Sequence, residues 1–432
     1  MSEIRVIADR FDAILADMGM EKYTYTLVQS EKHELNVEGG EFKLLRTVFN
    51  NWCKISVFRG AKKGTADCND NSEEGLRKLA GDALAAAESA EEDPCHDFAP
   101  DQGKHVFRQG VYEPDIDRFL SRMKELLATI AEEYPKIRIL SAVASYDRDH
   151  WISRTTNNTE FEGFKGKYDV YLEISATDGE STTGLDYFEF VAKDLDTPFI
   201  EMADMRRHLQ NTVNSLNPVA AEGKFTGTLL LTPDCVATFI SMLSQNYMGS
   251  DVIIDGTSQW LDKVGEQVMD DRITVSLKPY DERIVSGERG TQDGFLSEDV
   301  TVIDHGVLKM HMLNLYAANK TGRPMMQNTG NDMVVEPGDK TVDELLASIE
   351  HGLLMGGFSG GSPGVNGEFS GVAKNSFFIE NGKITGPATE TMVNGNLADI
   401  FRNVRGISKE LQCDGFSVIP FIAVDGVVIS GK

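Results

Sequence analysis

The chain of 432 residues lacks two short motifs by which common enzyme classes are recognised. It contains neither a GxxxxGK[ST] phosphate-binding loop nor an HExxH zinc motif. No apolar run reaches the roughly 18 residues that a membrane-spanning helix needs. The N-terminus is charged throughout, without the basic start and apolar middle of a signal peptide. We therefore expect a cytoplasmic protein whose function must be inferred from longer patterns.

Cysteine and positive charge are also scarce. The five cysteines are odd in number, widely spaced and without a CxxC pair, which favours reduced thiols over a disulfide framework. With 42 Lys and Arg against 68 Asp and Glu, the formal net charge is −26. Such a surface repels phosphate backbones and anionic lipids, so we expect neither nucleic-acid nor membrane binding.

The first half of the chain, residues 1–216, predicts an N-terminal α/β-type domain with an antiparallel meander. Apolar residues at helical spacing predict helices over 2–19, 72–92 and 114–133, with Ser72 as an N-cap. Short strands are predicted at 22–30, 41–49 and 53–59, and alternation over 136–193 predicts three or four strands. A helix near 197–213 precedes a boundary at 214–225 that contains proline and glycine.

The second half, residues 222–432, predicts a domain built on a large antiparallel, hairpin-rich sheet with flanking helices. A strand at 228–231 leads through Thr232 as cap and Pro233 into a helix that ends near 248. A turn is predicted at Asp304–Gly306 and a capping box at Thr341. Asn381-Gly382 and Asp425-Gly426 predict tight hairpins. The fold class is therefore α+β.

Three features could carry chemistry. His305 and His311 could approach each other around a turn, although a zinc site would need further ligands. Cys235 lies near a helix start, where the helix dipole could lower a thiol pKa, but its apolar neighbours favour an inert buried thiol. The glycine-rich segment 356–371 could expose backbone groups to an extended peptide, or be a flexible surface loop. Within it, the predicted substrate-binding residues are Gly356, Gly357, Gly367, Phe369 and Ser370.

A series of segments in the second half resembles the TldD/PmbA family. The matching segments include Gly256-Thr257-Ser258, Gly367-Glu368-Phe369-Ser370, the stretch 378–384 and Val393-Asn394-Gly395-Asn396. Each is weak alone, but their order between 225 and 432 is specific. The first half resembles the family more loosely, through its first helix and the alanine-rich helix at 72–92. Older names for the family refer to modulation of DNA gyrase, which we interpret as an indirect effect.

The resemblance implies that TldD-type members bind zinc through an HExxxH helix just before the Gly256-Thr257-Ser258 landmark. The corresponding positions here are Ser241, Met242 and Asn246, and no histidine occurs between His208 and His305. A hydroxyl and an amide cannot replace two imidazoles, and a thioether cannot act as a general base. The chain therefore resembles the PmbA branch, also called TldE, which lacks the zinc helix. We expect no catalytic residue, metal or cofactor in this chain.

The resemblance further implies a partner and a substrate. A TldD-type subunit would supply the zinc, and the pair would mature or degrade unfolded peptides as a dimeric metalloprotease. Two alternatives stay open at this point. One is a stand-alone, homodimeric peptide-binding scaffold. The other is a peptidase that uses different residues, such as Cys235 or the His305 and His311 pair.

Overall fold

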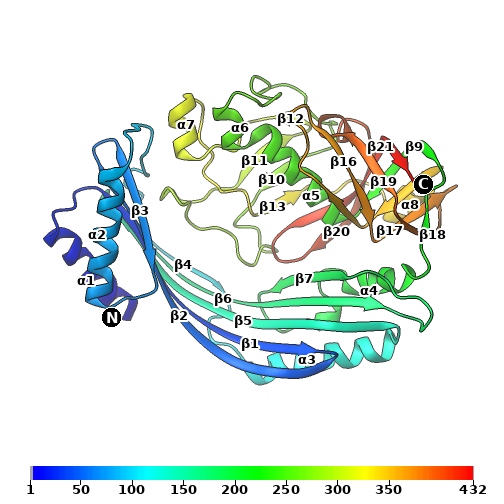
Figure 1. Ribbon diagram of the computed structural model, residues 1–432, viewed down its shortest axis with the longest axis horizontal. Coiled ribbons are helices and arrows are strands. Elements are labelled where there is room, and N and C mark those ends of the chain that lie inside the picture. Colours follow the sequence, from blue (N-terminus) through cyan, green and yellow to red (C-terminus); the bar gives the residue numbers. More distant parts are fainter. Residues whose placement is uncertain (1–2, 432) are drawn as a thin grey trace.

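The computed structural model describes residues 3–431, which form two sheets with flanking helices, an α+β fold as predicted (Figure 1). The first sheet has the strand order β3-β2-β1-β5-β6-β4, with β7 also paired to β6. All its pairs are antiparallel except β4 with β6. Its strands are β1 (Tyr23–Glu38), β2 (Glu41–Arg59), β3 (Lys62–Cys68), β4 (Lys104–Gly110), β5 (Ile137–Thr155), β6 (Glu160–Ala176) and β7 (Asp186–Ala192).

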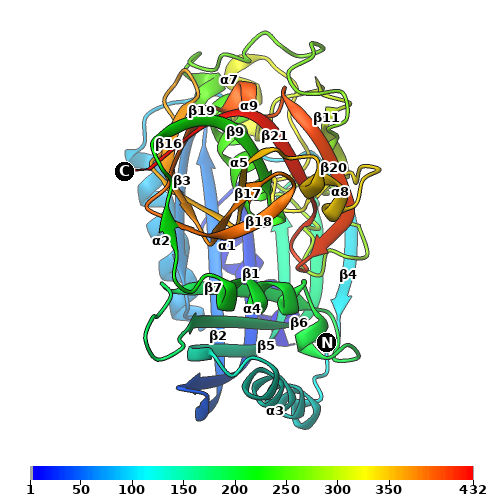
Figure 2. The same cartoon turned by 90° about the vertical axis from the view of Figure 1, so that its right-hand side faces the viewer.

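Three predicted helices of the first half are confirmed as α1 (Glu3–Asp17), α2 (Glu73–Ser89) and α3 (Ile116–Glu133). Ser72 caps α2, because its hydroxyl accepts a hydrogen bond of 3.1 Å from the Gly75 amide. In Figure 1 the sheet is strongly curved, α3 covers its convex side, and α1 and α2 lie at one end. The second half of the chain lies over the concave side, as the rotated view in Figure 2 also shows.

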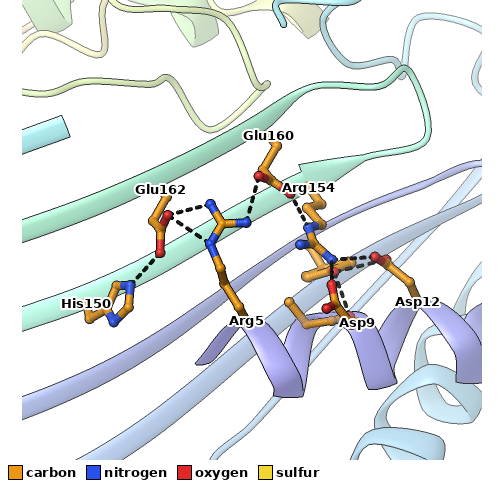
Figure 3. A network of polar contacts seen from close by, with 9 residues as sticks. Arg5, Asp9, Asp12, His150, Arg154, Glu160 and Glu162 are labelled. Atoms are coloured by element: carbon orange, nitrogen blue, oxygen red, sulfur yellow. Dashed lines mark hydrogen bonds and ion pairs between the residues drawn. The ribbon is translucent and has the colours of Figure 1, made fainter. Parts of the chain in front are cut away.

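An ionic network fastens α1 to the sheet (Figure 3). Arg5 on α1 contacts Glu160 at 3.1 Å and also pairs with Glu162 on β6. His150 Nε2 lies 2.8 Å from Glu162 Oε1. Arg154 reaches back to Asp12 of α1 at 2.7 Å. Because both arginines bridge the helix and the sheet, the register between these elements is held by charge as well as by the apolar face of α1.

Two predictions for the first half are wrong in detail. The runs 41–49 and 53–59 are one continuous strand, β2, because β1 pairs with it along its whole length. The helix at 197–213 is shorter, with a 3₁₀ turn, η1 (Phe199–Glu201), before α4 (Met205–Asn214). The meander over 136–193 is confirmed as the three strands β5, β6 and β7.

The second sheet has fourteen strands within residues 3–431, in a path β12-β11-β10-β13-β21-β9-β14-β17-β18-β8 with branches through β15, β16, β19 and β20. The strands are β8 (Val219–Ala220), β9 (Lys224–Leu231), β10 (Val275–Leu277), β11 (Val300–Asp304), β12 (Val307–Leu308), β13 (Met333–Val335), β14 (His351–Met355), β15 (Gly357–Gly360), β16 (Glu368–Lys374), β17 (Ser376–Glu380), β18 (Lys383–Thr389), β19 (Met392–Asn396), β20 (Val404–Cys413) and β21 (Val418–Ser430). Its helices are α5 (Pro233–Leu243), η2 (Ser244–Met248), α6 (Ser250–Ile254), α7 (Leu315–Thr321), α8 (Val342–Ala347) and α9 (Leu397–Ile400).

The turn predictions for this sheet have mixed outcomes. Asn381-Gly382 turns β17 into β18 and the segment Asp304–Gly306 turns β11 into β12, both as predicted. Thr341 forms the expected capping box with Glu344. Asp425-Gly426 is not a hairpin. It lies inside β21, where the register against β9 shifts between Val424 and Val427, so the positive φ of Gly426 serves a β-bulge.

The two halves contact each other through specific polar bonds. Asp93, in the loop after α2, accepts from Tyr316 Oη at 2.8 Å and pairs with Lys320 Nζ at 2.8 Å, both on α7. The Val191 amide of β7 donates to the Asp414 carbonyl at 2.7 Å. In the span 3–431, none of the helices is both long and apolar enough to cross a membrane.

Candidate functional site

The three positions that the resemblance assigns to the lost zinc motif lie on one continuous helical segment. Strand β9 ends at Leu231, and α5 begins with Pro233 as predicted. Thr232 does not cap this helix with its side chain; its hydroxyl instead contacts the Gly356 carbonyl at 3.4 Å. Ser241 and Met242 lie on α5, and Asn246 lies on η2, a single π-helical turn. Such turns recur at functional sites in proteins.

This helical segment and the glycine-rich loop enclose a groove of about 570 Å³. Ser241, Met242 and Asn246 all line it, together with Gln245 of the same segment. The opposite wall is formed by the segment 360–363. Asn246 Nδ2 donates a hydrogen bond to the Gly364 carbonyl at 3.3 Å, which ties the two walls together. The structure therefore brings the two features singled out in the sequence to one place.

One wall of the groove ends in a strand with a free edge. Among the described strands, β15 pairs with β16 on one side only, and it also contacts α5. Its residues Gly357 and Phe358 are half-buried, whereas Ser359 and Gly360 are exposed. An unpaired edge offers backbone N–H and C=O groups to an extended chain.

The five predicted substrate residues lie beside the groove and are not among the described residues that line it. Gly356 has a structural role, since a Cβ there would lie 2.1 Å from the Asn375 carbonyl oxygen. Gly367 has φ +83°, and a Cβ would lie 1.8 Å from the Tyr247 hydroxyl. Phe369 is buried and its ring centroid lies 5.1 Å from that of Phe239. Contact of these residues with substrate, including Gly357 and Ser370, stays a prediction.

Tyr247 is a residue that the sequence reasoning missed. Its ring stacks on Trp260 with centroids 4.9 Å apart, and it is fully buried. Its hydroxyl has no hydrogen-bond partner among the described residues. Burial raises the pKa of this phenol, so it stays protonated. No local sequence pattern marks a tyrosine that packs against a distant glycine of positive φ, so sequence reasoning could not identify it.

The groove lining is polar but uncharged. Thr238, Ser241, Gln245, Asn246 and Ser362 supply its polar side chains, and no Asp, Glu, His, Cys, Lys or Arg is among the described residues that line it. Within residues 3–431, His, Cys, Asp and Glu side chains nowhere gather in a group of three that could hold a metal ion. Hydroxyl and amide groups can hydrogen-bond a peptide, but none can act as a general base near neutral pH.

The other chemical candidates lie elsewhere. Cys235 is fully buried on the core side of α5, and burial raises its pKa to about 12, so the thiol stays protonated near neutral pH. His305 is exposed at a turn with Nδ1 3.2 Å from the Asp271 carbonyl, and His311 is buried with Nε2 3.0 Å from the Trp260 carbonyl. One ring nitrogen of each imidazole is therefore hydrogen-bonded to a backbone carbonyl.

The segments 357–361 and 360–364 both match the pattern Gly-x-Ser-x-Gly, which the sequence reasoning also missed. In a hydrolase this motif places the serine at a sharp turn from a strand into a helix. Here Ser359 lies within β15 and the next element is another strand, β16. The motif therefore lacks the structural setting that gives it catalytic meaning.

Comparison with known proteins finds a family for the second half of the chain. Residues 224–431 match the family model described as the PmbA/TldA metallopeptidase C-terminal domain. The chain carries a C-terminal domain of the PmbA/TldD family. The PmbA/TldD-type domain contains both walls of the groove, while the concave sheet of the first half lies outside it.

Full-length relatives extend the likeness beyond this domain. The chain is 24% identical over 390 residues to the metalloprotease PmbA homologue of Haemophilus influenzae, which covers 88% of this chain and 85% of that protein. It is 21% identical over 373 residues to metalloprotease PmbA of Escherichia coli O157:H7, covering 83% of this chain and 81% of the relative. The crystal structure of TldE from Thermococcus kodakarensis superimposes with a TM-score of 0.84 at 19% identity, over 98% of this chain and all of that one. The superposition shows that this chain and the Thermococcus kodakarensis protein share a fold.

Proposed function

We propose that this chain is a peptide-binding, TldE-like subunit without catalysis of its own, and that a TldD-type partner supplies the zinc of the joint protease. The observation that carries the proposal is the groove itself. The residues at the three zinc-motif positions are neutral, and they line a groove bounded by an open strand edge. Such a site can hold a peptide and cannot hydrolyse it unaided.

The free edge of β15 suggests how the peptide is held. An extended substrate would add a strand beside Gly357–Gly360, so that its main chain supplies most of the hydrogen bonds. The hydroxyl and amide side chains of α5 and η2 would contact its side chains from the floor. Recognition of the main chain suits unfolded peptides of varied sequence.

An exposed apolar strand supports the need for a partner. The outer half of β2, residues 41–52, extends beyond β3, which pairs only with residues 53–59. Phe49 is 74% exposed and Leu45 59% exposed, and their neighbours Phe42, Leu44 and Val48 are each more than a third exposed. A long unpaired edge with this many apolar side chains is a liability in a monomer. We infer that a second subunit, of TldD type or a copy of this chain, covers it.

The proposal is tested with purified subunits. The chain alone should contain no stoichiometric zinc and hydrolyse no unstructured peptide, whereas a TldD-type subunit mixed with it should do so. The substitution Met242→Arg, which places a bulky charge in the groove, should reduce the activity of the mixture. Lys383→Arg on the distant β17–β18 hairpin is the control. Chelator-sensitive hydrolysis by the chain alone would overturn the proposal, and a tight homodimer that ignores the TldD-type subunit would favour the scaffold alternative.

A further inference from the structure

A second cavity lies between the two halves of the molecule, on the concave face of the first sheet. It measures about 390 Å³, and the loop 289–294 of the second half closes it. Gly290 permits this closure, because a Cβ there would lie 2.7 Å from the Phe161 ring. Its floor consists of side chains from five strands, β1, β2, β3, β5 and β6.

The strand register arranges this floor in two adjacent rows. In one row, Trp52 and Trp151 stand on either side of Val28, on β2 and β5. In the next row, Lys54 and Ser153 stand on either side of Thr26, two residues further along. The Trp151 indole lies across the neighbouring strand β6 at Gly163. The lack of a side chain at Gly163 permits this, because a Cβ there would lie 2.0 Å from the indole nitrogen. An aromatic row therefore borders a polar, cationic row.

Three cations line this cavity against one carboxylate, that of Asp293. Lys54, Lys63 and Arg289 are all among its lining residues, and none forms an ion pair with any residue between 3 and 431. Lys54 stands opposite Asp67 in the register but is not bonded to it. In a chain of formal charge −26, a cluster of unpaired cations at a cavity is a local reversal of sign that attracts anions.

Arg289 is the most constrained of the three. Its Nη1 donates to the carbonyls of Gly287 at 3.2 Å, Glu288 at 3.1 Å and also Pro279, and its guanidinium lies 4.5 Å from the centre of the Tyr280 ring. Its Nε and Nη2 donate to no described residue. Asp299 and Asp332 lie close enough to act on its charge, but neither is paired with it. The open side of a guanidinium is the edge that binds a carboxylate with two parallel hydrogen bonds.

This cavity and the groove described above both share lining residues with a third space. A smaller cavity of about 360 Å³ shares Thr291, Gln292 and Asp293 with it. The same smaller cavity reaches Gln245, which also lines the groove. The three spaces thus follow one another from the glycine-rich loop, past η2, to the concave sheet.

From these contacts we infer that the cavity between the halves binds the carboxyl-terminal end of an extended peptide whose upstream part lies in the groove. The terminal carboxylate meets Arg289, Lys54 and Lys63, and an apolar last side chain packs against Trp52 and Trp151. Ser and Thr hydroxyls of the floor bond the last peptide groups. The inference rests on the proposed peptide-binding function, and it adds that the subunit recognises a free chain end.

The test measures binding of fluorescent, unstructured ten-residue peptides to the full-length chain by anisotropy. The peptides share one sequence ending in leucine and differ in having a free carboxylate, a carboxamide, or a carboxamide with one internal glutamate. The free acid should bind about tenfold or more tightly than the amide, because hydrogen bonds between charged groups are worth more than neutral ones. The double substitution Lys54→Gln and Lys63→Gln should bring the two within about twofold of each other.

One control variant and one further test variant complete the experiment. Lys383→Gln removes a distant exposed charge and should leave the preference intact. Arg289→Gln should abolish the preference. Because Arg289 also braces its own loop, the exposed Lys54 and the half-buried Lys63 provide the measurement if that variant fails to fold. Equal binding of acid and amide by the wild type, or an unchanged preference in the lysine variant, would overturn the inference. If the amide with internal glutamate binds as tightly as the acid, the cavity does not recognise a chain end.

The outcomes also separate this inference from the proposed function. Preference for the free acid without hydrolysis by any mixture with a TldD-type subunit would leave the cavity assigned and remove the protease role. Hydrolysis by the mixture with no preference for the free acid would support the protease role and remove the assignment of the cavity.

Discussion

Asn246 donates a hydrogen bond to the carbonyl of Gly364 at 3.3 Å. This bond joins the helical position that the resemblance aligns with a zinc ligand to the loop on the other side of the groove. An asparagine amide can make such a bond, and an imidazole coordinated to zinc through one nitrogen would have only the other available. Asn246 thus contributes to holding the groove in shape.

The close approach of Gly367 to Tyr247 predicts a large effect of a small substitution. Gly367→Ala should destabilise the fold by about 3 kcal/mol, since it combines a left-handed backbone with a steric clash. Gly361→Ala is the matched control in the same loop, because a Cβ there meets nothing within 4 Å. It should change stability by less than about 0.5 kcal/mol. Urea denaturation of both variants measures the difference, and equal midpoints would contradict the geometry.

The buried hydroxyl of Tyr247 predicts a gain from its removal. Tyr247→Phe keeps the stacking on Trp260 and removes a polar atom that has no described partner. Stability should stay level or rise by about 1 kcal/mol. Combined with Gly367→Ala, it should recover part of the loss, because the clashing atom is gone while the backbone strain remains. A double-mutant cycle showing strict additivity would mean that the two residues do not touch.

The cysteines predict a pattern of reactivity. Cys235 and Cys53 are fully buried and burial raises the pKa of both thiols, to about 12 for Cys235. Cys68, Cys95 and Cys413 are only partly covered. Brief iodoacetamide treatment of the native protein, followed by peptide mass spectrometry, should label the second group and leave Cys235 and Cys53 unmodified until denaturant is added. Rapid labelling of native Cys235 would reopen the nucleophile alternative.

A pair of carboxyl groups on the first sheet predicts a pH dependence of stability. Burial and the neighbouring Asp169 raise the pKa of Asp147 to about 6, despite Lys32 at 3.9 Å and a hydrogen bond from Ser145. The folded state therefore binds more protons than the unfolded state between about pH 4 and 6, so this contribution to stability is lost as the pH rises through that window.

Asp147→Asn removes the cost of ionising this group in the fold. The variant should be more stable than the wild type by about 1 kcal/mol at pH 7, after allowance for solvent screening, and should match it at about pH 4. Denaturation curves at the two pH values check the sign. A gain that is the same at both would show that the effect is not the ionisation of Asp147. Asp343→Asn, in the exposed first turn of α8, is the control. Its stability relative to the wild type should not increase between pH 4 and pH 7.

The exposed part of β2 predicts a site of association. Phe49→Lys should weaken the complex with a TldD-type subunit, or self-association, by about tenfold or more, since large exposed aromatic side chains dominate interface energies. Ile384→Lys is a comparable substitution of an exposed apolar residue on β18, far from β2, and should leave association unchanged. Sedimentation velocity measures both, and equal behaviour of the two variants would place the interface elsewhere.

The amino-acid sequence by itself determined what depends on neighbouring residues. The helices α1, α2 and α3, the cap at Ser72, the capping box at Thr341 and the turn at Asn381-Gly382 follow from local spacing and local hydrogen bonds. The absence of imidazoles at Ser241 and Asn246 is likewise a fact of the sequence. Local rules suffice for these features because each is stabilised within a few residues.

The tertiary structure decided what depends on pairing across the chain. Asp425-Gly426 became a bulge because β9 pairs with β21 on both sides of it. The groove formed because α5 and the segment 360–363, more than a hundred residues apart, pack together. The rows of tryptophan and lysine face one cavity only because β2 and β5 flank β1 in a given register. These relations arise from burial and strand pairing between distant segments, which local patterns do not encode.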